Sequence, residues 1–235
     1  MATTAVQRAK LDEKGTFRLG LGAGFGLAGA IVGIVLPAIF LILAIYNPGG
    51  FFTLAGTFLE VTGYLVLIGA LLLLVSLFLY RRSYAALRQV DRRFMLASVL
   101  CLIGSIGFLL LLVTAGIVVG NSSSLVACTN GAASHILTCL KSQQPLGAYT
   151  GLIGFWLGWI GGVGIVLGLF AAGSRFQRGA YAAGAIAYAL LLLILIGPFV
   201  GALVTIPDIG YSLLLVPVLG IVAPAAVLAG SRAPP

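Results

Sequence analysis

The residues best suited to chemistry lie together in one polar stretch, residues 120–149. It contains Cys128 and Cys139, and the only histidine of the chain, His135, lies between them. Disulfides persist on the outer side of cell membranes, where the charge distribution described below places this stretch, and closing this short ring would stabilise it by about 3 kcal/mol. The alternatives are a redox pair and a metal site with His135, but these three side chains are one ligand short of a closed tetrahedral zinc site. We therefore expect a structural Cys128–Cys139 disulfide and no bound metal.

Ligands for a redox cofactor are missing from the apolar part of the chain. A membrane cytochrome needs axial His or Met ligands within its helices. The only histidine is in the polar stretch, and the only methionines are Met1 and Met95, the latter at the edge of an apolar segment. The apolar segments also hold no acid–base or nucleophile set. We therefore expect neither a cofactor nor enzymatic activity.

One carboxylate, Glu60, is the single candidate for a site at the outer mouth of the molecule. Ionisable residues inside a membrane usually mark function, but Glu60 and Asp208 both fall at the outer ends of predicted spans. A span that ends at Tyr80 places Glu60 about 20 residues earlier, near the outer interface. An ion or solute site is one interpretation, and an interfacial carboxylate that caps a helix is the one we favour.

Composition defines the class of protein that surrounds these residues. The 235-residue chain is 61% hydrophobic and 8% charged, whereas about a quarter of the residues in a soluble domain are charged. This predicts an all-α, polytopic membrane protein. The net charge of +8 could suit nucleic acid, but there is no aromatic–basic platform and the positive residues gather at predicted helix ends. We therefore expect membrane lipids, and not nucleic acid, as partners.

Six apolar segments predict six transmembrane helices. We place them at residues 19–46, 60–80, 94–119, 151–172, 180–206 and 209–228. They form a transmembrane domain over residues 19–230, between a basic cytoplasmic tail at residues 1–18 and a short C-terminal tail at residues 231–235. Pro37 predicts a kink in the first helix. Residues 51–59 are interfacial or re-entrant.

The distribution of positive charge predicts the orientation. The first tail, the 81–93 loop, the 173–179 link and the last tail hold four, five, two and one of the thirteen Lys and Arg residues, and only Lys141 lies on the opposite side. The positive-inside rule then places both termini in the cytoplasm, in the cell membrane. The loop holds five arginines that we expect to contact lipid headgroups: Arg81, Arg82, Arg88, Arg92 and Arg93.

The same loop has apolar residues at helical spacing. Tyr84, Leu87, Val90 and Phe94 recur at steps of three, three and four. This spacing predicts a short helix that lies along the membrane surface with these side chains on the bilayer.

Two segments carry glycines on one helix face. The residues concerned are Gly22, Gly26, Gly29 and Gly33 in the first span and Gly147, Gly151, Gly154, Gly158, Gly161 and Gly168 around the fourth. Small residues let helix backbones approach closely in a membrane. These faces predict either packing inside the chain or docking to another subunit.

The expected function follows from the missing chemistry and from these contact surfaces. We expect a non-catalytic accessory or structural subunit of a larger membrane complex, with other integral membrane subunits as partners. The alternative is a small secondary transporter or channel with a three-plus-three inverted repeat. Nothing in the sequence points to a known family.

Overall fold

The part of the chain that the structure describes is helical. The computed structural model describes residues 5–37, 39, 48–120, 145–201 and 209–232. Its elements are α1 (Ala5–Ala30), the π-helical segment η1 (Ile31–Val35), α3 (Pro48–Leu87), α4 (Phe94–Gly120), α7 (Pro145–Phe176), α8 (Gly179–Gly201) and α9 (Ile209–Arg232). Within these residues, 6 helices are long and apolar enough to cross a membrane. The prediction of an all-helical protein with six spans is confirmed.

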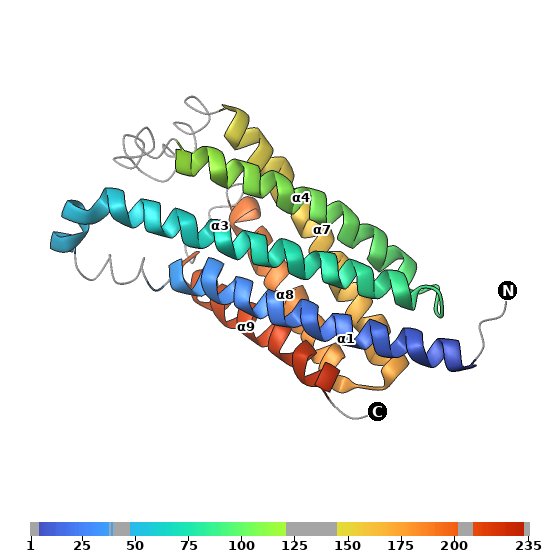
Figure 1. The fold of residues 1–235 in the computed structure, drawn as a ribbon. Helices are drawn as coiled ribbons and strands as arrows, with labels where there is room; N and C mark the ends of the chain where they lie inside the picture. Colours follow the sequence, from blue (N-terminus) through green and yellow to red (C-terminus); the bar gives the residue numbers. More distant parts are fainter. Residues whose placement is uncertain (1–4, 38, 40–47, 121–144, 202–208, 233–235) are drawn as a thin grey trace.

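The helices form a ring in chain order. Each of α1, α3, α4, α7 and α8 packs against the next helix along the chain, and α9 returns to pack against α1. Figure 1 shows that they run along one common direction and that the two termini lie at the same end. This arrangement gives every helix one face toward the middle of the bundle and one face toward the surroundings.

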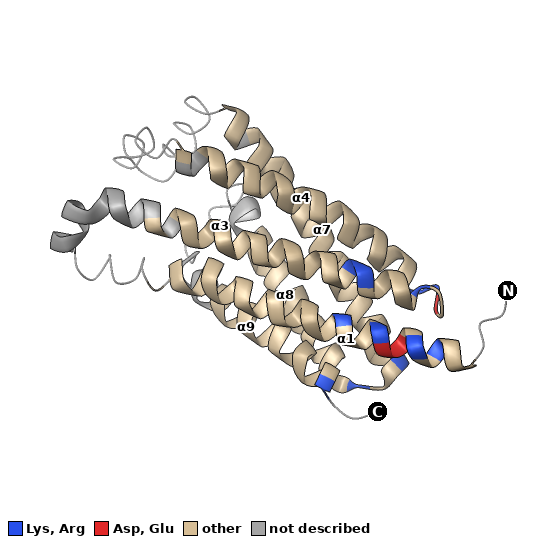
Figure 2. Ribbon diagram, viewed as in Figure 1, with Lys and Arg blue, Asp and Glu red and all other residues tan. Residues whose placement is uncertain are grey.

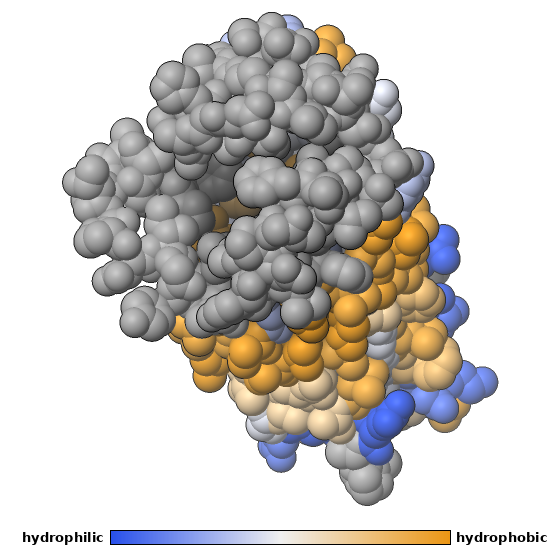
Figure 3. All heavy atoms as spheres, turned by 90° about the vertical axis from the view of Figure 1, so that its left-hand side faces the viewer, coloured by the Kyte–Doolittle hydropathy of each residue, from blue (hydrophilic) through white to orange (hydrophobic). Residues whose placement is uncertain are grey.

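Charge separates the two ends of the ring. Figure 2 shows the basic residues of the described chain gathered at the end where both termini lie, which we call the basic end. Figure 3 shows apolar side chains covering the flank of the bundle and hydrophilic ones toward the basic end. An apolar flank with a charged end is the surface expected of a multi-pass membrane protein.

The first helix begins earlier than the sequence suggested. Residues 5–18, which we expected to form a tail, continue the first span as part of α1. Their contacts with the bundle explain the difference, because Gly15 is buried and its carbonyl oxygen accepts a hydrogen bond of 2.7 Å from Ser83 Oγ. This segment packs partly through its backbone and not through a stripe of large apolar side chains.

The second span is also longer than expected. Helix α3 has 40 residues and includes residues 51–59, so these residues are helical and continuous with the second span. At about 1.5 Å per residue the helix is about 60 Å long, and a bilayer core is about 30 Å thick. The backbone of Glu60 lies in this helix, before the apolar span that begins at Gly63.

The prediction that the 81–93 loop forms a surface helix is wrong. Helix α3 continues to Leu87, a turn follows, and α4 begins at Phe94. The side chains of Tyr84, Leu87 and Phe94 are buried in the bundle instead of lying on the bilayer. Their helical spacing gives them a common face, and packing against α7 and α1, rather than lipid, covers that face.

The helix is irregular just before Pro37. The five residues of η1 are π-helical, and the amide of Leu36 donates to the carbonyl of Ile31, five residues earlier. Proline has no amide proton and its ring clashes with the carbonyl four residues before it. A wider turn ahead of Pro37 relieves that clash, so the expected irregularity takes the form of a π-helical segment.

Candidate functional site

A cavity of about 290 Å³ lies inside the ring and is the candidate functional site. All six spans contribute to its wall. One lining residue from each, in chain order, is Ala30, Ser76, Phe108, Trp159, Tyr188 and Gly220. The wall is therefore a property of the closed ring and not of any pair of helices.

Apolar side chains form most of this wall, and its polar groups are few. Among the described lining residues there is no charged side chain, no histidine and no cysteine. Ser76 Oγ donates to the Gly22 carbonyl at 2.7 Å, and Trp159 Nε1 donates to the Leu192 carbonyl at 3.1 Å. Because these two donors are already bonded to the protein, the cavity offers little polarity to a ligand.

Tyr188 brings a third polar group to the wall, close to Gly26. A Cβ atom at Gly26 would lie 3.0 Å from Ser76 Oγ and 3.4 Å from the Tyr188 hydroxyl. Ser76, Tyr188 and Gly26 therefore meet at one place, where the absence of a side chain on α1 leaves room for two hydroxyl groups.

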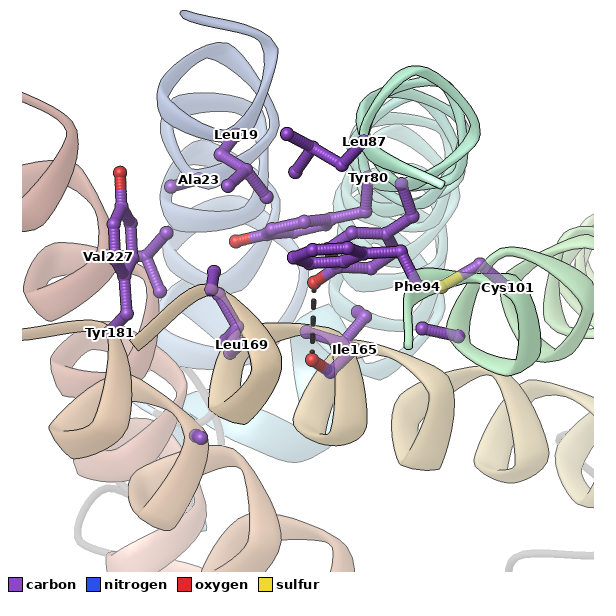
Figure 4. Packing of buried hydrophobic residues seen from close by; sticks show 14 of the residues in the cluster. Leu19, Ala23, Tyr80, Leu87, Phe94, Cys101, Ile165, Leu169, Tyr181 and Val227 are labelled. Carbon is purple, nitrogen blue, oxygen red and sulfur yellow. Dashed lines mark hydrogen bonds between the residues drawn. The ribbon is translucent and has the colours of Figure 1, made fainter. Parts of the chain in front are cut away.

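An aromatic cluster packs among the helices (Figure 4), on the basic-end side of the cavity-lining residue Leu77 of α3. Tyr84 lies between Tyr80 and Phe94, with ring centroids at 6.0 and 5.9 Å. The Tyr84 hydroxyl donates to the Ile165 carbonyl at 3.2 Å, which fixes the cluster to α7. All three rings are fully buried, and we call this cluster the aromatic plug.

One buried hydroxyl in this cluster makes no hydrogen bond of standard geometry. It belongs to Tyr80, and its polar neighbour is the Tyr188 hydroxyl of the cavity wall. Buried polar groups are bonded in the great majority of cases. The two hydroxyls therefore form a polar spot between the cluster and the cavity.

An ion-pair cluster lies outside the plug, at the basic end. Arg175, near the end of α7, donates two hydrogen bonds to Asp12 of α1, Nε to Oδ1 at 3.2 Å and one terminal nitrogen to Oδ2 at 2.8 Å. Its other terminal nitrogen lies 4.0 Å from Asp91, in the turn between α3 and α4. Bidentate arginine–carboxylate pairs hold two groups in a defined geometry. Arg175 thus connects three parts of the ring.

Helical irregularities flank the cavity on two neighbouring elements. Ile34, which lines the cavity, belongs to the π-helical segment η1. On α9, Pro217 and Pro224 lie on either side of the lining residue Gly220. Both elements therefore have broken hydrogen-bond ladders at the level of the cavity.

The glycine face of α7 packs inside the chain. Gly161 meets Gly104 of α4, where a Cβ on Gly161 would lie 2.5 Å from the Gly104 Cα atom. A Cβ on Gly154 would lie 2.9 Å from the carbonyl oxygen of Gly107. Further along α7, Gly168 faces the ring of Tyr84, while Gly147 is buried. Most of this face is therefore occupied by α4 and α3, and the remaining members behave similarly: Gly151 meets Thr114, and Gly158 lies 3.5 Å (from its would-be Cβ) from Phe108.

The glycine face of α1 and η1 also packs inside the chain, against α3. A Cβ on Gly29 would lie 2.9 Å from Leu73, and one on Gly33 would lie 2.9 Å from the Cα atom of Gly69. The sequence did not single out Gly69, Gly104 or Gly107, which are the opposing surfaces. In the sequence, each of these three glycines is only a small residue inside a long apolar run. That pattern is not specific in a chain with 33 glycines.

The remaining sequence candidates fall in different places. Cys128, Cys139 and His135 lie outside the described residues, as does the side chain of Glu60. In the described part, no group of three or more His, Cys, Asp or Glu residues could hold a metal ion.

The five arginines of the 81–93 segment separate into three groups. Arg82 and Arg88 line a cleft with two basic residues of α1. The guanidinium carbon of Arg81 lies 5.6 Å from the Phe78 ring centroid. Arg92 and Arg93 are exposed in the turn before α4. The sequence missed this division because it showed one run of charge.

No protein-family model matches the sequence, and neither the curated proteins nor the solved structures contain a match to the chain.

Proposed function

We propose that this protein is a non-enzymatic membrane carrier that binds a small, uncharged and mainly apolar solute in the middle of its helix ring. The observation that carries the proposal is the cavity of about 290 Å³ to which all six spans contribute. Ligand pockets are commonly of about 300 Å³ or more, and an apolar cavity of about 150 Å³ already holds benzene. The cavity thus suits a solute of one or two rings.

The chemistry of the wall supports this solute class. Ser76 and Trp159 use their donors within the protein, and the described lining residues include no charged group. A charged solute would lose its hydration without finding a partner, which is costly. A weakly polar group on the solute has the Tyr188 hydroxyl within reach of the same wall.

The irregular helices favour a carrier over a permanent binding protein. The π-helical segment η1 and the proline-flanked Gly220 of α9 both border the cavity. Broken helices beside a central site are the elements that move in many transporters. The aromatic plug and the Arg175 ion pairs then form the barrier that must open toward the basic end.

We further propose that the basic end faces the cytoplasm and that both termini lie there, in the cell membrane. The positive-inside rule supports this orientation, since twelve of the thirteen Lys and Arg residues belong to segments of that side. The sequence analysis linked a transporter to a three-plus-three inverted repeat. The carrier proposed here does not require that repeat, because its helices form a ring in chain order.

The glycine faces, which are one of the grounds for the subunit hypothesis, do not favour it over a carrier. Those of α7 and α1 lie against α4 and α3 of the same chain. Native mass spectrometry of gently solubilised protein separates the two functions. The carrier proposal expects the chain without a stoichiometric protein partner, and a constant partner would favour a subunit.

The cavity is tested by photolabelling in proteoliposomes with a small aryl diazirine. We expect label on Leu192, which faces the cavity, as well as on its neighbour Leu193, which is 64% exposed on the outside of α8. Excess naphthalene should compete saturably for label at Leu192 and should leave Leu193 unchanged. Equal, non-saturable labelling of the two residues would contradict a binding cavity.

A filling variant provides the matched control. A Cβ at Gly220 would meet Ala30 at 3.5 Å, an ordinary contact, so Gly220→Leu should add its side chain to the cavity without a backbone clash. Val222→Leu adds a methylene on the exposed face of the same helix. We expect Gly220→Leu to abolish labelling of Leu192 only, and Val222→Leu to leave both positions labelled.

A further inference from the structure

A second cavity lies at the basic end, between α1 and α3, and it differs from the central one in the charge of its lining residues. It has a volume of about 290 Å³, and we call it the basic cleft. Its lining residues are Leu11, Lys14, Arg18, Arg82, Ala85, Ala86, Arg88 and Gln89. Its apolar lining residues are Leu11, Ala85 and Ala86. Its rim has four cations, Lys14 and Arg18 from α1, Arg82 from α3 and Arg88 from the turn that follows α3.

The rim has no counter-charge among the described residues. No acidic side chain lines the cleft, and none of its four cations takes part in the ion pairs of the described chain, both of which belong to Arg175. Of the acidic residues nearest along the sequence, Asp12 and Asp91 are bound to that arginine. Glu13, which precedes Lys14, lines a neighbouring pocket and takes part in neither of these ion pairs. Four like charges that converge on one cleft attract an anion strongly.

The walls of the cleft are held in place by close contacts. Ser83 Oγ donates to the Gly15 carbonyl at 2.7 Å, and a Cβ on Gly15 would lie 2.7 Å from Leu87. An Arg18 nitrogen donates to the Arg82 carbonyl at 3.5 Å. The backbones that carry the cations are therefore held close together before any ligand arrives, so binding has only the side chains to order.

The position of the cleft indicates where its anion comes from. On α1 the cations end at Arg18, one residue before the buried Leu19, and on α3 Arg82 lies just beyond the buried Tyr80. This is the level at which the apolar flank changes to a charged surface. The guanidinium carbon of Arg82 also lies 5.3 Å from the ring centroid of Phe78, which is 40% exposed on the flank below.

We propose that the basic cleft binds the phosphate group of an anionic membrane phospholipid. The four cations hold the headgroup, and an acyl chain descends along the apolar flank past Phe78. Basic pockets between transmembrane helices recognise anionic headgroups in this way. The site is independent of the central cavity and does not rest on the proposed carrier function.

Native mass spectrometry of the full chain with phosphatidylglycerol and phosphatidylcholine of identical acyl chains tests the site. We expect one phosphatidylglycerol molecule to bind at least tenfold more tightly than phosphatidylcholine. Sodium glycerol phosphate, the soluble form of the same chemistry, should not displace it at equal concentration. Displacement would assign the site to a soluble phosphate compound and would overturn the lipid proposal.

Three double variants with equal charge removed separate a site from general attraction. Arg82→Gln with Arg88→Gln, and Lys14→Gln with Arg18→Gln, each remove two cations from one wall of the basic cleft. Arg92→Gln with Arg93→Gln remove two exposed cations from the neighbouring turn.

We expect the two cleft variants to lose at least tenfold in phosphatidylglycerol affinity and the turn variant to lose less than twofold. Circular dichroism and melting temperature verify that each variant is folded. Equal losses in all three would show diffuse attraction and overturn the proposal, as would unchanged affinity in folded cleft variants.

Discussion

The crossing of α4 and α7 should fail when a single methyl group is added at Gly104. A Cβ atom there would run into the Cα atom of Gly161 and would lie 3.0 Å from the Gly161 nitrogen and from Leu77. Two of these three neighbours are backbone atoms, which cannot rotate away. Gly104→Ala must therefore move one helix relative to the other.

The cost can be bounded from two opposing terms. Overpacking a close contact costs about 1–3 kcal/mol, while replacing glycine by alanine inside a helix gains roughly 0.5–1 kcal/mol. Gly116→Ala, on the same helix, isolates the second term, because nothing lies within 4 Å of a Cβ atom at that position. The difference between the two variants then equals the packing term, and we expect Gly104→Ala to be less stable than Gly116→Ala by about 1–3 kcal/mol.

Unfolding in mixed micelles of mild detergent and SDS measures this difference. Trp156 and Trp159 both lie on α7, so their fluorescence follows the separation of α7 from its neighbours. Both variants replace glycine by alanine in the same helix of the same protein. The contribution of the added methyl group's hydrophobicity therefore cancels when their stabilities are compared. If Gly104→Ala proved as stable as Gly116→Ala, the close crossing of α4 and α7 would be refuted.

Two further outcomes test other parts of the ring. Asp12→Asn should lower the free energy of unfolding by about 1 kcal/mol, because it weakens the bidentate pair with Arg175, whose side chain is 23% exposed. A double-mutant cycle with Arg175→Gln measures the coupling between the two residues. Additive effects of the two substitutions would contradict the ion pair. An impermeant maleimide applied to intact cells should modify no cysteine before reduction and should modify Cys128 and Cys139 after it, whereas Cys101, with 0% exposure, stays unmodified. Loop labelling before reduction would count against the disulfide, and loop thiols that react only in lysed cells would reverse the proposed orientation.

Hydropathy was sufficient to predict the helices because a bilayer leaves few choices. A backbone in hydrocarbon must satisfy its own hydrogen bonds, so each long apolar segment becomes a helix, and α8 and α9 lie where expected. The basic residues gather at one end for the same reason, since a charge in the apolar flank is costly.

The contacts between helices were harder to predict, because a stripe on one helix does not name the surface that it meets. The face of Gly161 was visible in the sequence, but its opposing residue Gly104 was not. The length of a helix can also depend on a contact with another helix. Residues 5–18 are an example, because Ser83 of α3 bonds to the backbone of Gly15 in this part of α1. These relations depend on which helix surfaces pack together, and no single segment encodes that.

The central cavity arises because the side chains that face the middle of the bundle change in size along its axis. Six helices around one axis leave a central space that side chains must fill. Toward the basic end it is filled by large side chains, among them Tyr80, Tyr84 and Phe94. Further along, the positions that face inward include Gly158, Gly162 and Gly220.

The irregular segments border the hollow level and not the filled one. In chain order, η1 on the first span contributes Ile34 to the cavity wall, and the Pro217 and Pro224 of α9 flank the same level. A packed level resists motion, since cores transmit strain rather than absorb it, whereas a hollow level with weakened helix ladders can change shape at low cost. The ring thus combines a tightly packed level with a hollow level bordered by irregular helices. The proposed carrier function needs both, a barrier at the packed level and a chamber that can change shape.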